Sequence, residues 1–291
     1  KEAELSFQQA IKFNPNLAQG HYNLGKMYMD IGQVKEAELS FQQAIKINPN
    51  RQSYFHYANL LFEKQSFDEA ILCINKASLF TGNEIENYLL SAAKSGINYA
   101  RKHLINKSKA ENVVSSKKFD RIIVNRTVES ELISYLYTLK NRQLEITKDA
   151  RYGKGLCSTD FKLLEDDSKI ISSLGKDIKA ICKEELDKKE IIFCDSFFNI
   201  FVSGCGAGKH HHIKQQDGKF NLHLHKYSLV YYLEIGDQNG EDPGILKLYD
   251  PEEEILPSNG MIVIIDGKKN HSVSYNGNKD RVMIGVNFYG F

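Results

Sequence analysis

This sequence has few cysteines, almost no net charge and no long apolar run. The five cysteines are scattered, odd in number and never spaced as Cys-x-x-Cys. This argues against a disulfide framework or a zinc ribbon and favours a reducing, cytoplasmic compartment. The net charge is +1, and no apolar run is long enough to span a membrane. We therefore expect no nucleic-acid partner and no membrane association, and at 291 residues the chain is long enough for two soluble domains.

Two common catalytic motifs are also missing. The sequence has no Gly-x-Ser-x-Gly elbow for a serine nucleophile. The stretch GCGAGKH at 204–210 resembles a phosphate-binding loop, but Ser203 replaces the first glycine of that motif, and His210 follows Lys209 where Ser or Thr is needed. We interpret these glycines as places where the backbone passes close to a site or a neighbouring strand. The acidic run DPEEE at 250–254 predicts a solvated loop.

The first third of the chain is repetitive. The stretch KEAELSFQQAIKFNPN at 1–16 recurs at 35–50 with fifteen of sixteen positions identical, at an offset of 34 residues. This period is that of the tetratricopeptide repeat, a helix–turn–helix unit, which the chain resembles over roughly residues 1–105. Small and large residues stand where two packed helices need them, and a degenerate third copy follows: Leu24, Gly25, Tyr28, Ala37, Phe41 and Ala44, then Ala58, Ala70, Ile74 and Ala77. The stretch 86–104 predicts a closing helical cap.

We therefore predict an all-α tetratricopeptide-repeat solenoid with its cap at residues 1–106. Residue 1 falls inside a repeat unit, so we expect the array to be incomplete at its N-terminus, and a signal peptide is neither ruled in nor ruled out. Stacked repeats usually present a surface to a peptide or protein, which we favour over a spacer or a dimerisation arm. The isolated His21, His56 and His103 are predicted to be packing or surface residues.

The pattern changes after the repeats. Residues 107–120 are polar and aperiodic and predict a linker. A strand is expected at 121–125, then a helix with Thr127 as a candidate N-cap, and a second helix over 167–189. Short aromatic and β-branched runs follow, separated by Gly, Asn, Asp and Pro, which is typical of a sandwich or barrel. We predict an α+β domain at 121–291, a double-stranded β-helix (jelly roll) with packed helices.

Histidines concentrate in this second domain. Two His-x-His pairs, His210/His212 and His223/His225, are candidates for chelating one ion, because alternate residues of a strand point the same way. His223 and His225 run without a break into the next apolar stretch and are expected on that strand. The Asp217-Gly218 turn signal after His212 favours the first pair, with His211 pointing outward. His271 is the third candidate ligand, since no other histidine remains in the domain.

The C-terminal domain resembles the iron(II)- and 2-oxoglutarate-dependent oxygenase superfamily. The residues that carry the resemblance are SGCGAGKHHHI, KYSLVYYLEIGDQ, PGILKLYDPEEEILPSNGMIVII and HSVSYNGNKDRVMIGVNFY, over roughly 121–291. It is similar within that superfamily to oxygenase domains that follow tetratricopeptide repeats in bacterial proteins. The resemblance implies His271 as the distal ligand of iron(II). It also implies Arg281, ten residues later, as the cation that binds the far carboxylate of 2-oxoglutarate.

One departure separates this sequence from the superfamily pattern of His-x-Asp/Glu. No histidine is followed two places later by Asp or Glu, so His212 replaces the carboxylate unless Asp217 reaches in. Met283 also stands where many relatives have a small hydroxyl residue. Three functions follow as hypotheses: a dioxygenase that hydroxylates a peptide or protein side chain recruited by the repeats, a small-molecule hydroxylase whose repeats oligomerise, and a non-catalytic metal-binding adaptor. The oligomeric state is left open.

Overall fold

The computed structural model describes residues 2–81, 86–107, 121–144 and 155–291. The chain divides into two compact units, one of residues 1–113 with 216–222 and one of residues 114–215 with 223–291. Among the helices so described, none is long and apolar enough to cross a membrane. Of the predicted linker 107–120, residues 108–120 lie outside the described residues.

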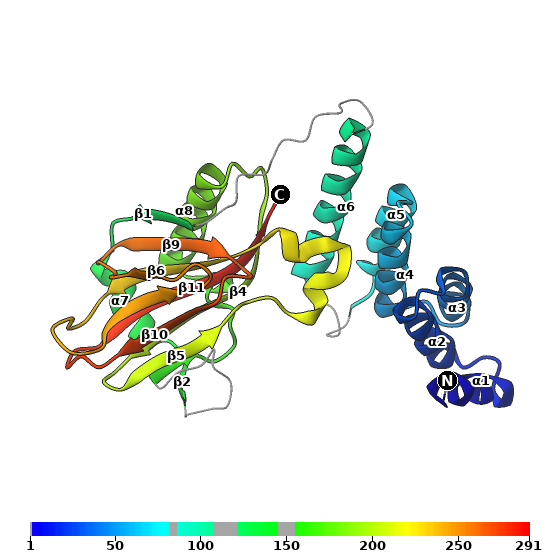
Figure 1. Ribbon diagram of the computed structural model, residues 1–291, viewed down its shortest axis with the longest axis horizontal. Helices are drawn as coiled ribbons and strands as arrows, with labels where there is room; N and C mark the ends of the chain where they lie inside the picture. Colours follow the sequence, from blue (N-terminus) through cyan, green and yellow to red (C-terminus); the bar gives the residue numbers. More distant parts are fainter. Residues whose placement is uncertain (1, 82–85, 108–120, 145–154) are drawn as a thin grey trace. The chain divides into compact units, whose positions relative to one another are not determined.

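The first unit is built from helices that follow one another along the chain (Figure 1). They are α1 (Glu2–Phe13), α2 (Ala18–Asp30), α3 (Val34–Ile47), α4 (Arg51–Glu63), α5 (Phe67–Ala77) and α6 (Asn87–Lys107). The pairs α2/α3 and α4/α5 are the predicted helix–turn–helix repeats, and α6 is the helix expected as a cap. The prediction of an N-terminal repeat solenoid is confirmed.

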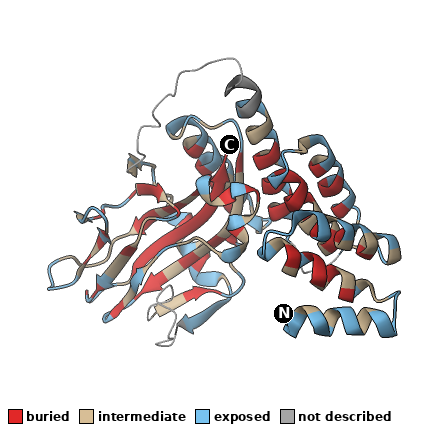
Figure 2. Ribbon diagram, turned by 45° about the vertical axis from the view of Figure 1, so that its right-hand side comes forward, coloured by how far each residue is buried: buried red, intermediate tan, exposed pale blue. Residues whose placement is uncertain are grey.

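Small residues let the paired helices approach closely. Gly25 on α2 lies against Phe41 on α3, and a Cβ added at Gly25 would stand 2.8 Å from the Phe41 ring. Ala37 and Ala44 on the same helix as Phe41 are fully buried. The repeat therefore places a glycine on one helix opposite a phenylalanine on the next, and the phenylalanine ring fills the space between the helices. Figure 2 shows the buried residues along the inner sides of these helices.

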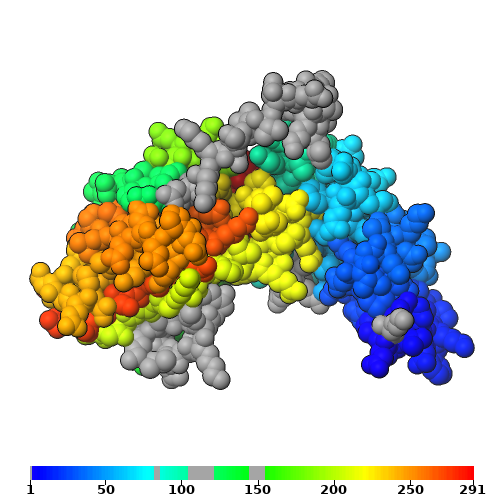
Figure 3. All heavy atoms as spheres, in the orientation of Figure 1, coloured from blue at the N-terminus to red at the C-terminus, as the bar shows by residue number. Residues whose placement is uncertain are grey.

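A short segment from much later in the chain completes the first unit. Residues 216–222 belong to an irregular 3₁₀ stretch, η2 (Gln215–Leu224), with non-helical backbone at Lys219, Phe220 and Asn221. Phe220 is 1 % exposed, and its ring meets those of Phe55 and Phe62 on α4 at centroid distances of 5.3 and 5.6 Å. In Figure 3 the yellow atoms of this segment lie against the blue and cyan atoms of the repeat helices.

The second unit contains two antiparallel sheets within its described residues. The seven-stranded sheet has the order β1-β9-β6-β11-β4-β3-β2, and the four-stranded sheet the order β5-β10-β7-β8. The strands of the first are β1 (Arg121–Asn125), β9 (Met261–Asp266), β6 (Lys226–Glu234), β11 (Arg281–Gly290), β4 (Ile191–Phe201), β3 (Gly155–Ser158) and β2 (Asn141–Leu144). Those of the second are β5 (Cys205–His210), β10 (His271–Tyr275), β7 (Pro243–Leu248) and β8 (Glu253–Ile255). Two facing sheets of this kind form the predicted jelly roll, which is confirmed.

Alternation along the strands sorts side chains between two cores. Val282, Ile284 and Val286 of β11 point to the side covered by α7 (Ser130–Thr138) and α8 (Lys169–Glu185). Met283 on the same strand joins the core between the two sheets. The period of two therefore leaves one face of β11 for packing against helices and the other for the interior of the jelly roll.

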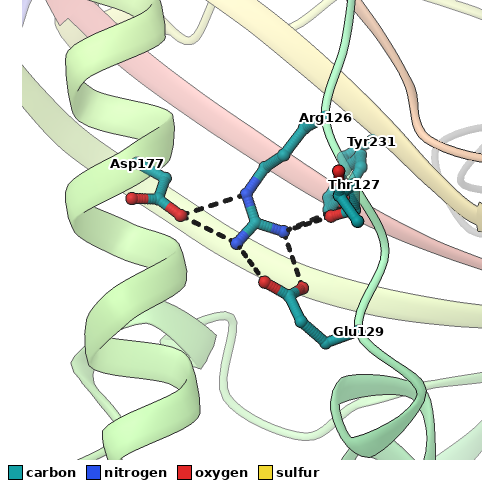
Figure 4. A network of polar contacts seen from close by, with 5 residues as sticks. All are labelled: Arg126, Thr127, Glu129, Asp177 and Tyr231. Carbon is teal, nitrogen blue, oxygen red and sulfur yellow. Dashed lines mark hydrogen bonds and ion pairs between the residues drawn. The ribbon is translucent and has the colours of Figure 1, made fainter.

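Arg126 ties the helical layer to the large sheet (Figure 4). Its guanidinium donates to both carboxylate oxygens of Glu129 at 2.8 Å, to Asp177 of α8 at 2.8 Å, and to the Tyr231 hydroxyl of β6 at 3.0 Å. It also donates to the Thr127 carbonyl. Burial alone would lower the pKa of Arg126, but these bonds outweigh it and raise the pKa, so the charge is held in place.

Three local expectations were wrong. Helix α7 begins at Ser130 after Glu129, so Thr127 is not its N-cap. The acidic run 250–254 is only partly a loop, because β8 begins at Glu253 and pairs with β7. His223 lies in η2 and His225 just before β6, so neither is on that strand. The glycine interpretation is confirmed at Gly206, where a Cβ would overlap the Val273 carbonyl of the neighbouring strand, but not at Gly204, where a Cβ would meet nothing within 4 Å.

Candidate metal centre

Strand pairing brings two of the predicted ligands side by side. His210 ends β5 and His271 begins β10, and the two are direct partners in the antiparallel register. A register shift follows between His271 and Val273. Residues directly opposite each other in antiparallel strands project to the same face, so both imidazoles stand at the same end of the small sheet.

His212 reaches the same place from outside the strand. It follows the end of β5 by two residues, and its backbone N–H donates to the Gly267 carbonyl at 2.9 Å. This bond ties the loop after β5 to the turn before β10. His211, between the two candidate ligands, is exposed, as expected. The outward position of His211 thus comes from a strand end and a loop rather than from one regular strand.

The three imidazoles converge on one point. One ring nitrogen from each of His210, His212 and His271 lies within 4.8 Å of the others, and Nε2 of His212 is 3.2 Å from Nε2 of His271. Two nitrogens bound to one ion at about 2.1 Å lie roughly 3–3.5 Å apart. The separation between His212 and His271 therefore matches a shared metal ion.

Hydrogen bonds to backbone carbonyls select the tautomer of two rings. Nδ1 of His271 lies 3.0 Å from the Lys269 carbonyl, and Nδ1 of His210 lies 2.7 Å from the Gly208 carbonyl. A carbonyl can only accept, so Nδ1 carries the proton in both rings and Nε2 keeps its lone pair. Burial, helped by the neighbouring His210, lowers the pKa of His271 to about 4. His271 is therefore neutral at pH 7, as a metal ligand must be.

The histidines form part of the wall of a cavity of about 300 Å³, which is the lower end of the range for small-molecule sites. The rest of the wall is mixed in character. Its apolar members are Phe161, Phe197, Phe201, Ala207, Leu229, Val230, Val273, Met283 and Gly285, and its polar members are Asp160, Asp195, Asn199, Lys214, Ser228 and Asn287.

An ion pair lies in the cavity wall. Lys214 Nζ lies 2.9 and 3.1 Å from the two carboxylate oxygens of Asp195, and Asn287 Nδ2 lies 3.5 Å from one of them. The sequence analysis did not find these residues. A signal was present in the polar positions Asp195 and Asn287, which interrupt the otherwise aromatic and aliphatic strands β4 and β11.

Arg281 is enclosed in the protein near this cavity and does not line it. It is 0 % exposed, and its guanidinium lies over the rings of Tyr232 and Tyr275 at 5.0 and 5.6 Å. Nη1 donates to the Pro243 carbonyl, whereas Nε and Nη2 have no hydrogen-bond partner among the described residues. Burial lowers the pKa of Arg281. Met283 and Gly285, at the alternate positions of the same strand, do line the cavity.

The other polar candidates stand apart from the cluster. Asp217 is fully buried and belongs to the first unit, and it is not among the residues that line the cavity. The His225 ring packs on Phe291 at 4.8 Å. His223 and His225 are likewise not among the lining residues. The carboxylate missing from the His-x-His sequence is thus not supplied by Asp217.

Comparisons with known proteins add the following. Residues 18–51 match the tetratricopeptide repeat family. No curated protein matches this chain significantly.

Similar solved structures include a prolyl-4-hydroxylase from Pseudomonas putida, with 14% identity over 60% of this chain and 94% of that chain and a TM-score of 0.42. Another is an oxidoreductase of the 2OG-Fe(II) oxygenase family from Burkholderia pseudomallei, with 11% identity over 72% and 93% and a TM-score of 0.43. A third is a viral collagen prolyl hydroxylase from Paramecium bursaria Chlorella virus-1 in complex with 2OG, with 11% identity over 62% and 100% and a TM-score of 0.44.

Proposed function

We propose that the chain is an iron(II)- and 2-oxoglutarate-dependent dioxygenase that hydroxylates a peptide or protein side chain recruited by its repeats. The observation that carries the proposal is the convergence of His210, His212 and His271 on the wall of a cavity between two jelly-roll sheets. The proposal divides the chain into repeats at 1–106, a linker at 107–120 and an oxygenase domain at 121–291.

The three histidines fit a divalent iron. They would offer three imidazole nitrogens to one ion, and the cavity beside them has room for further ligands. Imidazole is a ligand that suits iron, and facial sets of three protein ligands with open positions are typical of iron oxygenases. Three neutral ligands leave the full +2 charge uncompensated, whereas a carboxylate would reduce it by one. The site would therefore favour anionic ligands, such as a 2-oxo acid.

Arg281 fits the far carboxylate of 2-oxoglutarate. Two of its nitrogens, Nε and Nη2, have no hydrogen-bond partner among the described residues although the cation is fully buried, an arrangement that costs free energy until an acceptor arrives. Lys214, unlike Arg281, stands in the cavity wall, but its charge is already balanced by Asp195. We therefore assign the carboxylate to Arg281 and a role in shaping the cavity to the Lys214–Asp195 pair.

When bound, iron(II), 2-oxoglutarate and dioxygen together convert a C–H bond to C–OH, with 2-oxoglutarate leaving as succinate and carbon dioxide. The chain's own residues would hold the reactants in a confined space of mixed character. Phe197 and Val273 contribute apolar surface to it, and Gly285 leaves room for the Phe197 ring, which a Cβ there would overlap. Confinement matters because reacting groups must meet in one orientation.

The test uses the full chain with iron(II), 2-oxoglutarate and a peptide library. We expect succinate release and a +16 Da product on some peptides, both lost in His271→Ala. Free amino acids and small apolar acids serve as the comparison set. Turnover of these small compounds with no turnover of any peptide would contradict recruitment by the repeats and favour a small-molecule hydroxylase.

No carboxylate joins the cluster among the described residues, which favours a second candidate, a metal-binding adaptor without catalysis. Metal binding with no succinate release under any condition would support it. His212→Asp in the full chain makes the comparison sharper, because it creates the His-x-Asp sequence with one fewer positive charge on the loaded site. If His212→Asp releases succinate and the natural chain does not, the three-histidine site has lost catalysis and kept the fold.

A further inference from the structure

The inner surface of helix α4 already has an occupant. Helix α4 carries Phe55, Asn59 and Phe62, and all three side chains are buried. The aromatic rings of Phe55 and Phe62 enclose the Phe220 ring at 5.3 and 5.6 Å. This face is therefore covered by a segment that follows the repeats by more than a hundred residues.

Polar contacts fix the position of that segment. The backbone N–H of Phe220 donates to Asn59 Oδ1 at 2.9 Å, and Asn59 in turn donates to Glu63 at 3.0 Å. Gln216 donates to the Tyr88 hydroxyl on α6 at 3.1 Å. The first unit thus contacts three groups of the segment: one aromatic ring, one backbone N–H and one side-chain amide. Short peptides are recognised by the same kinds of contact.

Two acidic groups lie near the basic residue of this segment. Burial lowers the pKa of Lys219 and Lys26 lowers it further, while Asp30 and Glu63 partly offset this. Burial likewise raises the pKa of Glu63, against the hydrogen bond from Asn59 and the charge of Lys219. The repeats therefore offer acidic groups to a basic residue beside Phe220, and the contacts of Phe220 itself carry the placement.

The backbone of the segment is shaped by its surroundings. Phe220 and Asn221 have φ angles of +52° and +54°, a left-handed conformation that a bulky residue rarely adopts on its own. Asn visits this conformation readily, whereas Phe220 is held there by its contacts with Phe55, Phe62 and Asn59. The α4 surface therefore stabilises a turn that Phe220 would rarely form alone.

We propose that the α4 surface of the repeats is a binding site for a short basic–aromatic turn, and that residues 216–222 of this chain are its built-in ligand. A polypeptide partner that uses the same surface has to displace Phe220 first. The inference concerns the repeat unit alone and needs neither metal nor 2-oxoglutarate, so it succeeds or fails separately from the oxygenase proposal.

Competition in trans tests the proposal. The probe is a fluorescein-labelled peptide of residues 214–224, and binding to the full chain is followed by anisotropy without metal. A tethered segment has an effective concentration of about 1 mM, so for a surface with an intrinsic Kd of about 100 µM the internal ligand weakens the peptide's apparent affinity roughly tenfold. We expect Phe220→Ala to bind the peptide about tenfold more tightly than the natural chain.

Three controls distinguish specific binding of the peptide to the α4 surface from non-specific binding. Phe13→Ala removes an aromatic ring that is 92 % exposed and should leave peptide affinity unchanged. Asn59→Ala added to Phe220→Ala should abolish the gain, and a peptide with alanine in place of Phe220 should not bind. Equal affinity of the natural chain and Phe220→Ala, or no binding to either, overturns the proposal.

Hydrogen exchange provides a second measurement that does not depend on how well Phe220→Ala folds. In the natural chain the Phe220 amide should exchange slowly, because it is bonded to Asn59. Excess unlabelled peptide should accelerate that exchange at least severalfold, as the internal segment is displaced. An unchanged rate at saturating peptide would show that residues 216–222 are a fixed part of the fold.

Discussion

Replacing His271 by alanine should remove most of the metal affinity of the second unit. His271 is 5 % exposed, and it is the candidate ligand that stands next to both others, paired with His210 across the sheet and 3.2 Å from His212 between Nε2 atoms. Structural sites with four ligands bind zinc with about 10–16 kcal/mol, which is roughly 2.5–4 kcal/mol for each ligand. Loss of one ligand should therefore weaken binding by about 100- to 1000-fold.

Calorimetric titration with Mn²⁺ or, without oxygen, Fe²⁺ measures this loss directly. A thermal shift gives an independent value. Metal at 100 times its Kd stabilises the folded state by about 2.7 kcal/mol, which raises the Tm of a domain of 150–250 residues by about 5–10 °C. The shift should be absent in His271→Ala at the same metal concentration.

Two histidines of the same region serve as matched controls. His211 is exposed, and the buried Nδ1 of His223 has no partner among the described residues, yet neither belongs to the cluster. His211→Ala and His223→Ala should each keep the metal affinity within a few-fold. If instead His223→Ala and His225→Ala abolish binding while His210→Ala does not, the assignment of the ligands is wrong.

Three further predictions concern other parts of the molecule. Arg281→Ala should weaken 2-oxoglutarate binding by tens- to thousands-fold in a titration of the metal-loaded chain while metal content is unchanged, because about 2–5 kcal/mol is lost with a buried charged partner; unchanged affinity would make the arginine purely structural. Gly244→Ala should destabilise the second unit by more than about 2 kcal/mol in thermal unfolding, because φ is +81° and the new Cβ would overlap the Arg281 guanidinium, whereas Gly218→Ala, with open space around it, should cost under about 1 kcal/mol; equal costs would contradict this. Burial lowers the pKa of His56 to about 4, so between pH 6.5 and 4 only the unfolded chain gains the proton. The folded repeats should therefore lose up to about 3 kcal/mol of stability as the pH falls through this range. His56→Gln should flatten that dependence, and a pKa near 6.5 by NMR would refute it.

The elements that could be predicted from the sequence are those whose contacts are local or strongly periodic. The 34-residue offset predicts helix pairs because each repeat mainly contacts its neighbours. Helix α8 follows from the spacing of its buried Ile171, Leu174 and Ile178. Strands β6, β9 and β11 follow from apolar runs that are too short and too β-branched for helices.

The elements that could not be predicted depend on distant partners. Strand β5 is rich in glycine and has little strand propensity, and it forms because Gly206 lets β10 approach closely. Strands β2 and β3 are four residues each, and β3 is extended by pairing with β4. The 3₁₀ stretch after His212 is stabilised by contacts with α4, more than 150 residues earlier in the chain. No local sequence pattern predicts such a contact.

The candidate site divides in the same way. Spacing left two His-x-His pairs open, and the turn signal after His212, with the resemblance that implies His271, chose the three histidines that the structure brings together. The reason for their convergence was different from the expected one, since His212 is held by Gly267 and not by a strand. Asp195 and Lys214 were missed because an ion pair between a strand and a loop has no sequence period.

The position of residues 216–222 changes how the two halves of the chain can be separated by experiment. Gln216 follows the candidate ligand His212 by only four residues, yet it belongs to the unit formed by the repeats. Removing residues 1–105 would take away α4 and leave Phe220, now buried against Phe55 and Phe62, without the surface that covers it. A truncated chain that loses metal would therefore not show that the repeats take part in metal binding, because the loop after His212 would have lost its support. Asn59→Ala in the full chain removes one hydrogen bond to that loop and deletes neither unit. A change of metal affinity in this variant would therefore show that the metal centre depends on the repeats.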